Sequence, residues 1–170
     1  MGWIKNSLTF ISICVLLVSC KLTYTFNGAS IDYSKIKTIQ ISEFPVRSTY
    51  VWGPMGPMFN NELKDIFARH TRLHQVKHNG DLKIEGEITQ YQQRNKSVSS
   101  KGNSVQTELS ITVNVRFSNR TNHHEDFERQ FTATASYETT RSLSSVQEKL
   151  VSQMIKDLTE QIFNSTVANW

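Results

Sequence analysis

The residues with the clearest chemistry in this chain are Leu17-Val18-Ser19-Cys20, in which a cysteine follows a small residue. A basic residue, Lys5, precedes an apolar run from Leu8 to Val18, which is the layout of a secretory signal. A cysteine directly after such a run is typical of a bacterial lipobox, where the chain is cut before the cysteine and the new N-terminus is acylated. We therefore expect residues 1–19 to be a lipoprotein signal peptide and Cys20 to carry lipid.

Two other interpretations of this segment remain open. It could be an ordinary cleaved signal that ends at a chance cysteine, or a permanent transmembrane helix. The apolar run is only about half of the ~20 residues that a spanning helix needs, which disfavours the helix. Each buried methylene of an acyl chain contributes about 0.8 kcal/mol, so several chains on Cys20 would make a durable anchor. The segment thus predicts a protein tethered to a membrane outside the cytoplasm.

Three histidines, His70, His74 and His78, have the i, i+4, i+8 spacing that would line one face of a continuous helix and could bind a metal. The turn signal at Asn79-Gly80 predicts instead that the helix ends near His70, which would separate them. His123-His124 lies in a polar turn. We therefore expect solvated histidines and no metal site or cofactor.

Catalytic chemistry is not indicated either. Glu85 and Glu87 share one parity of a predicted strand beside Lys83, and a half-solvated charged face accounts for them. The sequence contains no signature of a serine nucleophile and no glycine-rich phosphate loop. We expect no catalytic residues, and the chain is not predicted to be an enzyme.

Basic residues are the remaining candidates for ligand binding. Arg94, Lys96 and Lys101 share one polar loop, whereas Arg116 and Arg120 lie on the next strand and its exit. Lysine and arginine are the usual partners of phosphate, so these residues are candidates for contact with anionic lipid. In an antiparallel sheet the loop and Arg120 would lie at opposite ends. Scattered solubilising charge is the alternative interpretation.

Composition limits the classes of protein to which this chain can belong. Removal of residues 1–19 from the 170-residue chain leaves 151, which suits one domain with a real core. The two cysteines are Cys14 and Cys20, so no free thiol is expected after processing. Loss of Lys5 leaves 18 basic against 15 acidic residues, a net charge of +3. No block of five like charges occurs, so a nucleic-acid-binding arm is not predicted.

The first half of the mature chain predicts a strand, a loop and a helix. Lys37 to Phe44 is rich in β-branched residues and ends at Pro45, which predicts a strand. Turn formers fill residues 47–58, and a helix is expected to begin near Pro57. Its apolar face is formed by Phe59, Leu63, Ile66 and Phe67.

The second half predicts strands and then a helix. Asn79-Gly80 signals a turn before a long alternating strand, in which Gly86 indicates either a bulge or a close backbone approach. Residues 109–117 and 127–137 alternate cleanly and are joined by a short connection, which predicts an antiparallel meander. Ser145 and Glu148 form a potential capping box for a terminal helix whose apolar stripe runs from Val146 to Val167.

Together these elements predict an α+β fold. Each long strand has one apolar face and each helix has one apolar stripe. The economical arrangement is a two-layer sandwich, with two helices packed on one face of a mainly antiparallel sheet of four or five strands. The opposite face would remain uncovered and would carry polar residues: Lys83, Glu85, Thr112, Asn114, Arg116, Glu128 and Thr132.

The mature chain resembles the LptE family of lipopolysaccharide-assembly lipoproteins. The resemblance rests on the order of several short pieces after the lipobox. These are Phe26 to Ile31, Lys37 to Phe44, Gly80-Asp81-Leu82, Gly86-Glu87-Ile88 with Tyr91, Leu109 to Phe117 with Asn119, Ile162-Phe163-Asn164, and Val167 to Trp170.

This resemblance implies a non-enzymatic subunit at the outer membrane, on its periplasmic side and in a barrel lumen. Members of the family sit inside the large β-barrel LptD, support its assembly and assist insertion of lipopolysaccharide into the outer leaflet. Lys21 follows the lipid cysteine where an acidic residue would suggest inner-membrane retention. A stand-alone lipoprotein that binds a lipid or another small ligand is the alternative function.

Overall fold

The structure, a computed structural model, describes residues 31–96 and 106–168 of the chain. The predicted signal peptide, Cys20 and Lys101 lie outside these described residues. The elements are β1 (Thr38–Ile41), α2 (Met55–His70), β2 (His74–Gln75), β3 (Leu82–Lys96), β4 (Gln106–Asn119), η1 (His123–Glu125), β5 (Phe127–Glu138), α3 (Leu143–Phe163) and the π-helical turn η2 (Asn164–Ala168).

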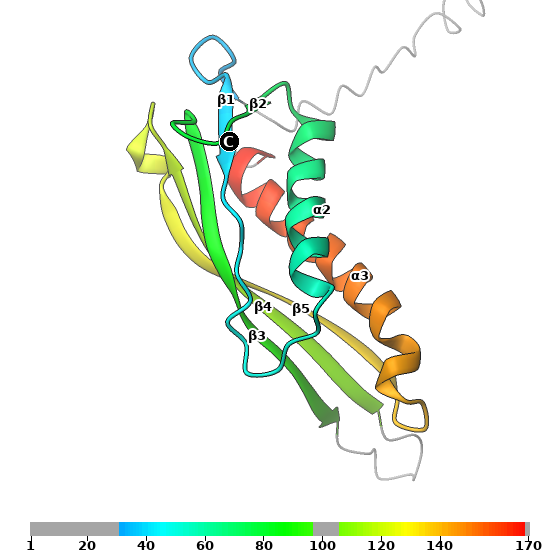
Figure 1. Ribbon diagram of the computed structural model, residues 1–170. Helices are drawn as coiled ribbons and strands as arrows, with labels where there is room; N and C mark the ends of the chain where they lie inside the picture. Colours follow the sequence, from blue (N-terminus) through cyan, green and yellow to red (C-terminus); the bar gives the residue numbers. More distant parts are fainter. Residues whose placement is uncertain (1–30, 97–105, 169–170) are drawn as a thin grey trace, which may run out of the picture.

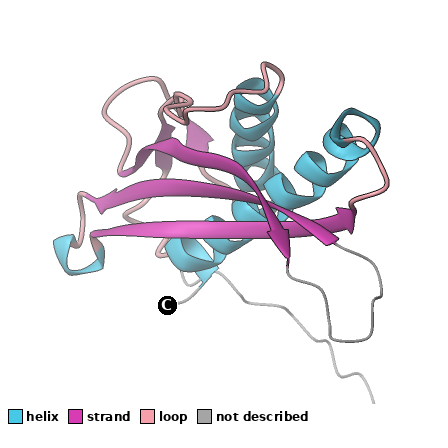
Figure 2. Ribbon diagram, turned by 90° about the horizontal axis from the view of Figure 1, so that it is seen from below, coloured by secondary structure: helices cyan, strands magenta, loops and turns pink. Residues whose placement is uncertain are grey.

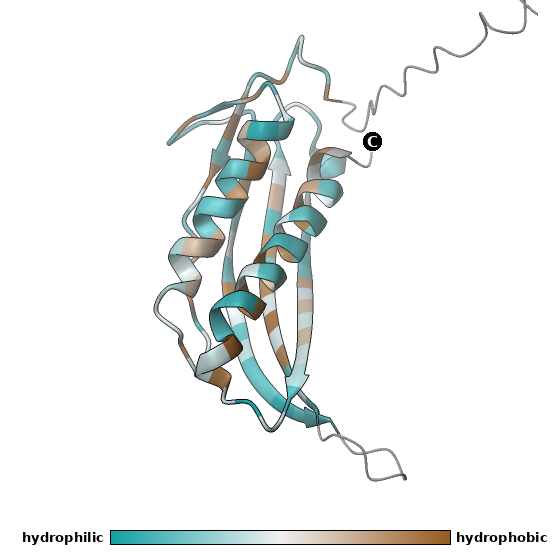
Figure 3. Cartoon of the chain, turned by 90° about the vertical axis from the view of Figure 1, so that its right-hand side faces the viewer, coloured by the Kyte–Doolittle hydropathy of each residue, from teal (hydrophilic) through white to brown (hydrophobic). Residues whose placement is uncertain are grey.

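The strands form one mixed sheet of five strands in the order β2-β1-β3-β4-β5. The long strands β3, β4 and β5 make the predicted antiparallel meander, whereas β1 runs parallel to both β2 and β3. Both helices cover the same face of this sheet (Figures 1 and 3). The predicted α+β sandwich, mostly antiparallel and with two helices, is therefore confirmed.

The core lies between the helices and the sheet. The apolar stripe of α3 is buried, with Val151, Met154 and Leu158 fully inaccessible to solvent. The helix α2 contributes its predicted apolar face and ends at His70, as its sequence indicated. Figure 3 shows that the hydrophilic positions of both helices face away from the sheet. In the described part of the chain, neither helix is long and apolar enough to cross a bilayer.

The start of α3 corrects one prediction. The helix begins at Leu143 with Ser142 as its N-cap, and no side chain caps it. Ser145 and Glu148 therefore lie inside the helix and do not form a capping box. The Ser145 hydroxyl instead donates a hydrogen bond of 2.7 Å to the Ser142 carbonyl.

Gly86 resolves the two interpretations of the interrupted strand. A Cβ atom there would lie 2.6 Å from the Phe44 ring and 2.0 Å from the Asn114 carbonyl oxygen, so Gly86 marks a close approach. The irregularity in the register lies further on, between Ile88 and Gln90. Thr89 is the extra residue of this bulge. After it the odd-numbered residues of β3 face the core, so Tyr91 rather than Gln90 is buried.

The chain continues along β3 beyond the end of β1. Ser42 N–H donates to the Ile84 carbonyl, and Arg47 N–H donates to the Ile88 carbonyl, at 2.9 and 2.8 Å. Further on, the Ser48 hydroxyl accepts a bond of 2.8 Å from Tyr91 N–H. The segment 42–48 therefore covers the outer edge of β3, with Pro45 in the middle.

The Asn79-Gly80 turn joins two strands that do not pair with each other, because β1 lies between β2 and β3. Asn79 has a positive φ of 56°, a conformation that asparagine tolerates. Asp81, two residues after Asn79, connects this turn to the start of β1 through hydrogen bonds. Its Oδ2 accepts hydrogen bonds from Lys37 N–H, Thr38 N–H and the Thr38 hydroxyl, at 2.9, 2.9 and 2.8 Å.

These bonds make Asp81 a pH-dependent clamp. The Lys37 N–H bond is the main cause that lowers the pKa of Asp81 below its ordinary value, and the Thr38 bonds lower it further against the opposing effect of burial. A carboxyl whose pKa is lower in the folded state stabilises the fold above its unfolded pKa, about 3.9. That contribution is lost as the pH falls through the lower, folded pKa.

We expect Asp81→Asn to cost about 1–2 kcal/mol at neutral pH, because the site is partly solvated. The free energy of unfolding of the variant should also fall less steeply than that of the parent as the pH drops below about 4. Denaturant unfolding across this range measures both effects, with Asp65→Asn on the exposed side of α2 as the charge-matched control. Equal pH dependence of parent and Asp81→Asn would contradict the clamp.

Candidate functional site

The face of the sheet opposite the helices is open, and it is where most of the predicted binding residues lie. Polar side chains from β3, β4 and β5 cover it, and none of the described helices packs on it (Figures 1 and 2). The antiparallel registers place Glu85 opposite Arg116, Arg116 opposite Glu128, and Thr112 opposite Thr132. The predicted polar composition of this face is therefore confirmed.

One half of the open face carries a row of ion pairs. Arg116 is 2.9 Å from Glu128 and 3.7 Å from Glu85, and Lys83 is 2.6 Å from Glu85. Hydrogen bonds from Asn114 and then from Arg116 lower the pKa of Glu128 below its ordinary value, and Glu128 in turn raises the pKa of Arg116. Arg116 is thus already neutralised by carboxylates, which weakens it as a ligand for phosphate.

The other half of the open face is a hydroxyl- and amide-lined groove of about 560 Å³. At its centre the hydroxyls of Thr112 and Thr132 are 3.1 Å apart, and the Thr112 hydroxyl lies 3.4 Å from Gln90 Oε1. Arg94 and Glu108 line it as well, and they lie opposite each other across the β3–β4 pair. Such a groove can hydrogen-bond a polar surface.

The predicted basic residues divide into two groups at opposite ends of the sheet. Arg94 and Lys96 lie at the far end of β3, paired with the start of β4, whereas Arg120 follows the end of β4 and bonds the Asn79 carbonyl at 3.4 Å. This separation was predicted. The predicted loop is corrected for Arg94 and Lys96, because β3 extends to Lys96, whose ammonium is 2.7 Å from Glu108. Lys101 lies outside the described residues.

A cavity near the far end of β3 was not found from the sequence. It has a volume of about 560 Å³ and lies between the segment 48–50, β3 and the first residue of α3, Leu143. Tyr50, which is 51% exposed, stacks on Tyr91 with ring centroids 5.3 Å apart. Burial raises the pKa of Tyr91, although a bond of 2.9 Å from Gln147 acts to lower it. The hint in the sequence was Tyr91, an odd-numbered residue in a strand whose earlier core residues, such as Ile84 and Ile88, are even-numbered.

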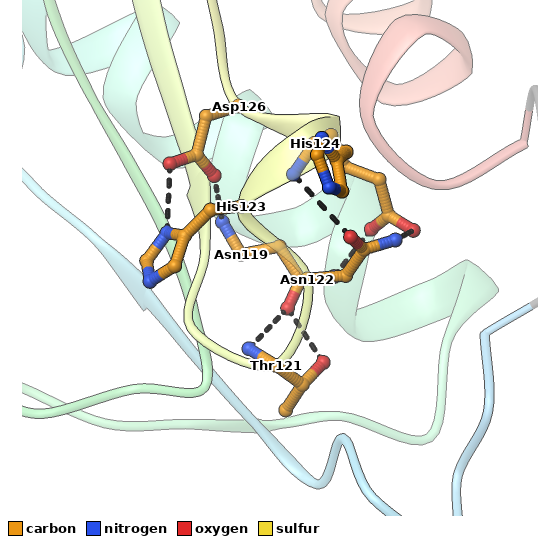
Figure 4. A network of polar contacts seen from close by, with 7 residues as sticks. Asn119, Thr121, Asn122, His123, His124 and Asp126 are labelled. Carbon is orange, nitrogen blue, oxygen red and sulfur yellow. Dashed lines mark hydrogen bonds and ion pairs between the residues drawn. The ribbon is translucent and has the colours of Figure 1, made fainter.

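The turn between β4 and β5 holds a network of polar contacts (Figure 4). Asp126 accepts a bond of 2.7 Å from Asn119 N–H and lies 3.0 Å from His123 Nδ1. Partial burial acts to raise the pKa of Asp126, but these two partners outweigh it and lower the pKa overall. The His123 side chain is 77% exposed, and the network closes the turn rather than forming a pocket.

The histidines of the predicted stripe are separated as expected. His70 ends α2, His74 lies in β2 and His78 lies in the following turn, and all three are exposed. Within the ranges 31–96 and 106–168, no group of histidine, cysteine, aspartate or glutamate side chains could hold a metal ion.

Comparison with known proteins gives a family. Residues 36–166 match the model of the family described as LptE, lipopolysaccharide-assembly. No curated protein matches the chain.

Several solved structures share the fold. A minor lipoprotein from Acinetobacter baumannii is 19% identical, with a TM-score of 0.55, 79% of this chain covered and 94% of that one. A hypothetical protein from Chlamydia trachomatis is 12% identical, with a TM-score of 0.53 and coverage of 79% and 99%. A putative neuraminyllactose-binding hemagglutinin homolog from Helicobacter pylori is 13% identical, with a TM-score of 0.53 and coverage of 82% and 87%. At these identities the likeness concerns the fold alone.

Proposed function

Since the chain belongs to the LptE family of lipopolysaccharide-assembly lipoproteins, we propose that it is a lipid-anchored subunit of the lipopolysaccharide transport machine at the outer membrane. In this role it occupies the lumen of an LptD-type β-barrel, supports assembly of that barrel and assists insertion of lipopolysaccharide into the outer leaflet. The role is non-enzymatic and needs no cofactor.

The observation that carries this proposal, beside the family, is the uncovered polar face of the sheet. The lumen of a large membrane barrel is polar, so a protein that fills it needs hydrophilic surfaces and not an apolar belt. The ion pairs of Arg116 and the threonine groove provide such a surface. Tyr50 and Val51 are the exposed large hydrophobic side chains of the described residues, and they lie next to each other in one loop.

Contact with lipopolysaccharide is proposed at the basic end of β3. Arg94 is exposed there, Lys96 ends the same strand, and Lys101 follows five residues later in the sequence. Arg116 and Arg120 remain secondary candidates, because Arg116 lies between two carboxylates, Glu85 and Glu128, whereas Lys96 has one, Glu108. A charge-assisted bond to a phosphate contributes about 1.5–3 kcal/mol when partly desolvated and much less when it stays exposed.

We expect the triple change Arg94→Ala, Lys96→Ala and Lys101→Ala to weaken binding of purified lipopolysaccharide by roughly tenfold or more. The melting temperature should not change, and the loss should shrink at high salt because screening weakens exposed contacts first. The measurement is a binding titration at low and at high salt.

The matched control for this experiment removes three exposed cations elsewhere: Lys77→Ala, Lys149→Ala and Lys156→Ala. It changes the net charge equally, so it separates a local site from general attraction between a basic protein and an anionic lipid. If both triple variants bind like the parent at low salt, the loop is only a solvated connection. If both lose affinity equally, net charge alone explains binding.

Lipidation of Cys20 is a separate part of the proposal. Mass spectrometry of the mature protein should find an N-terminus that begins at Cys20 and carries acyl chains. Cys20→Ala should leave the protein unanchored or unprocessed, because the acyl chains provide the anchoring free energy. An unmodified N-terminus at any other residue would disprove the lipoprotein assignment.

A second candidate function is a stand-alone lipoprotein that binds a lipid or other small ligand. The cavity beside Tyr50 and Tyr91 favours it, because its volume and its partly apolar lining suit an acyl or aromatic group. A protein with this function would bind its ligand without a barrel partner, which is the property that distinguishes the two candidates.

A further inference from the structure

The sheet has one protected edge and one open edge. On the protected side, β2 contains only two residues, and the outer edge of β3 is covered by the segment 42–48 with Pro45 in it. Short edge strands and proline are devices that prevent further strands from pairing. This side of the sheet therefore cannot accept another long strand.

The opposite edge is β5, which has none of these devices. Its twelve residues, FERQFTATASYE, contain no proline, glycine or lysine, and its register with β4 is continuous from Phe127 to Glu138. In Figure 2 it is the long strand that starts beside the short η1 helix and borders the sheet. A long and regular edge strand is a template for pairing with another chain.

The hydrogen bonds of β3 determine which backbone groups of β5 point outward. Ile88 and Tyr91 bond to the segment 45–48, so Gln90 directs its backbone groups toward β4 and its partner Thr112. Consistently, the Thr112 carbonyl accepts a bond of 3.2 Å from the Thr89 hydroxyl on the β3 side.

Because backbone groups point to alternate edges along a strand, the direction of each residue in β4 and β5 follows. Odd-numbered residues of β4 face β5, and their partners in β5 are also odd-numbered, for example Ile111 with Ala133. The even-numbered residues of β5 therefore direct N–H and C=O groups away from the sheet. These residues are all exposed: Glu128, Gln130, Thr132, Thr134 and Ser136.

We propose that the β5 edge is a docking site for an extended segment of another polypeptide, which adds to the sheet as a sixth strand. Such strand addition draws its affinity from main-chain hydrogen bonds and its specificity from alternate side chains. The outward amides of Thr132 and Thr134 lie at the centre of the site. On one side the added strand continues the polar open face, and on the other it extends the layer on which α3 packs.

The charges of β5 favour a different polypeptide over a second copy of this chain. On the open face, β5 carries Glu138 and Glu128, of which Glu128 is paired with Arg116 of β4, and it carries no basic side chain. Two antiparallel self-pairs align the most residues of β5. The one centred on Ala133 would place Glu128 opposite Glu138 of the copy, twice, and the one centred on Thr132 would place Glu138 opposite Asp126 of the copy, twice. Like charges directly opposite each other destabilise a strand pair. The occupant should therefore carry basic residues near its ends and hydroxyl or other small polar residues between them.

The test uses the mature full chain and a synthetic peptide in which threonine and valine alternate between two terminal lysines. The peptide is N-methylated on its valines, so only one of its edges can donate backbone hydrogen bonds and it cannot form stacks of more than two strands. Amide exchange by NMR should be fast at Thr132 and Thr134 in the free protein. At saturating peptide it should slow by about tenfold or more at these two amides.

Two variants distinguish main-chain pairing from side-chain contact. Thr134→Pro removes an outward N–H without removing a bond to β4, so the protein should fold normally and lose binding of the peptide. Thr134→Ala keeps that N–H and should still bind. A peptide methylated on all its amides should not bind to either variant or to the parent.

The proposal is overturned if the peptide leaves the exchange of Thr132 and Thr134 unchanged, or if these amides are already slow in the dilute free protein. It is also overturned if sedimentation shows concentration-dependent dimers that Thr134→Pro abolishes, because a second copy is then the occupant. None of these measurements uses lipopolysaccharide or a barrel protein, so their outcome is independent of the proposed function.

Discussion

The fold depends on covering one face of a strongly patterned sheet. β3, β4 and β5 direct their large apolar side chains to the same side, and several of them, such as Ile111, Val113 and Phe117, are fully buried. An uncovered apolar face of this size would cost far more than the protein's net stability. The helices α2 and α3 remove it from water, and they also pack on each other, where the rings of Phe67 and Phe163 lie 5.2 Å apart. The face of the sheet opposite the helices is consequently polar, and its ion pairs and its groove remain accessible to other molecules.

That division explains which features could be predicted from the sequence. Strict alternation in β4 and β5 and the stripes of both helices depend on local spacing, so the antiparallel meander and the two-layer arrangement follow from them. The parallel placement of β1 and β2 depends on chain direction across α2, which periodicity does not record. The bulge after Ile88 was equally hidden, because Gly86 offered a more obvious interruption.

The candidate site was predicted less completely than the fold. Its residue types and its open face followed from the parity of each strand. Pair partners depend on register between strands, so the contact of Lys96 with Glu108 could not be foreseen. The cavity at Tyr50 and Tyr91 combines a loop, a shifted strand and the start of α3, which are separated widely in sequence. Nothing in the sequence indicated that Tyr50 and Tyr91 would stack on each other.

Different parts of the protein's surface suit different kinds of contact. The open polar face suits contact with a hydrated wall, the basic end of β3 suits an anionic lipid, and the β5 edge suits an extended chain. The proposed lipid anchor at Cys20 would hold these surfaces at the membrane. In the proposed function these surfaces act through contact with partners, and the central partner is a barrel.

The most direct measurement is therefore purification of the tagged, lipidated full chain from detergent-solubilised outer membranes, followed by determination of its mass and stoichiometry. The account predicts a stable complex with one LptD-type β-barrel protein in a one-to-one ratio. Recovery of the chain alone, under mild detergent and without loss of its lipid, would contradict it.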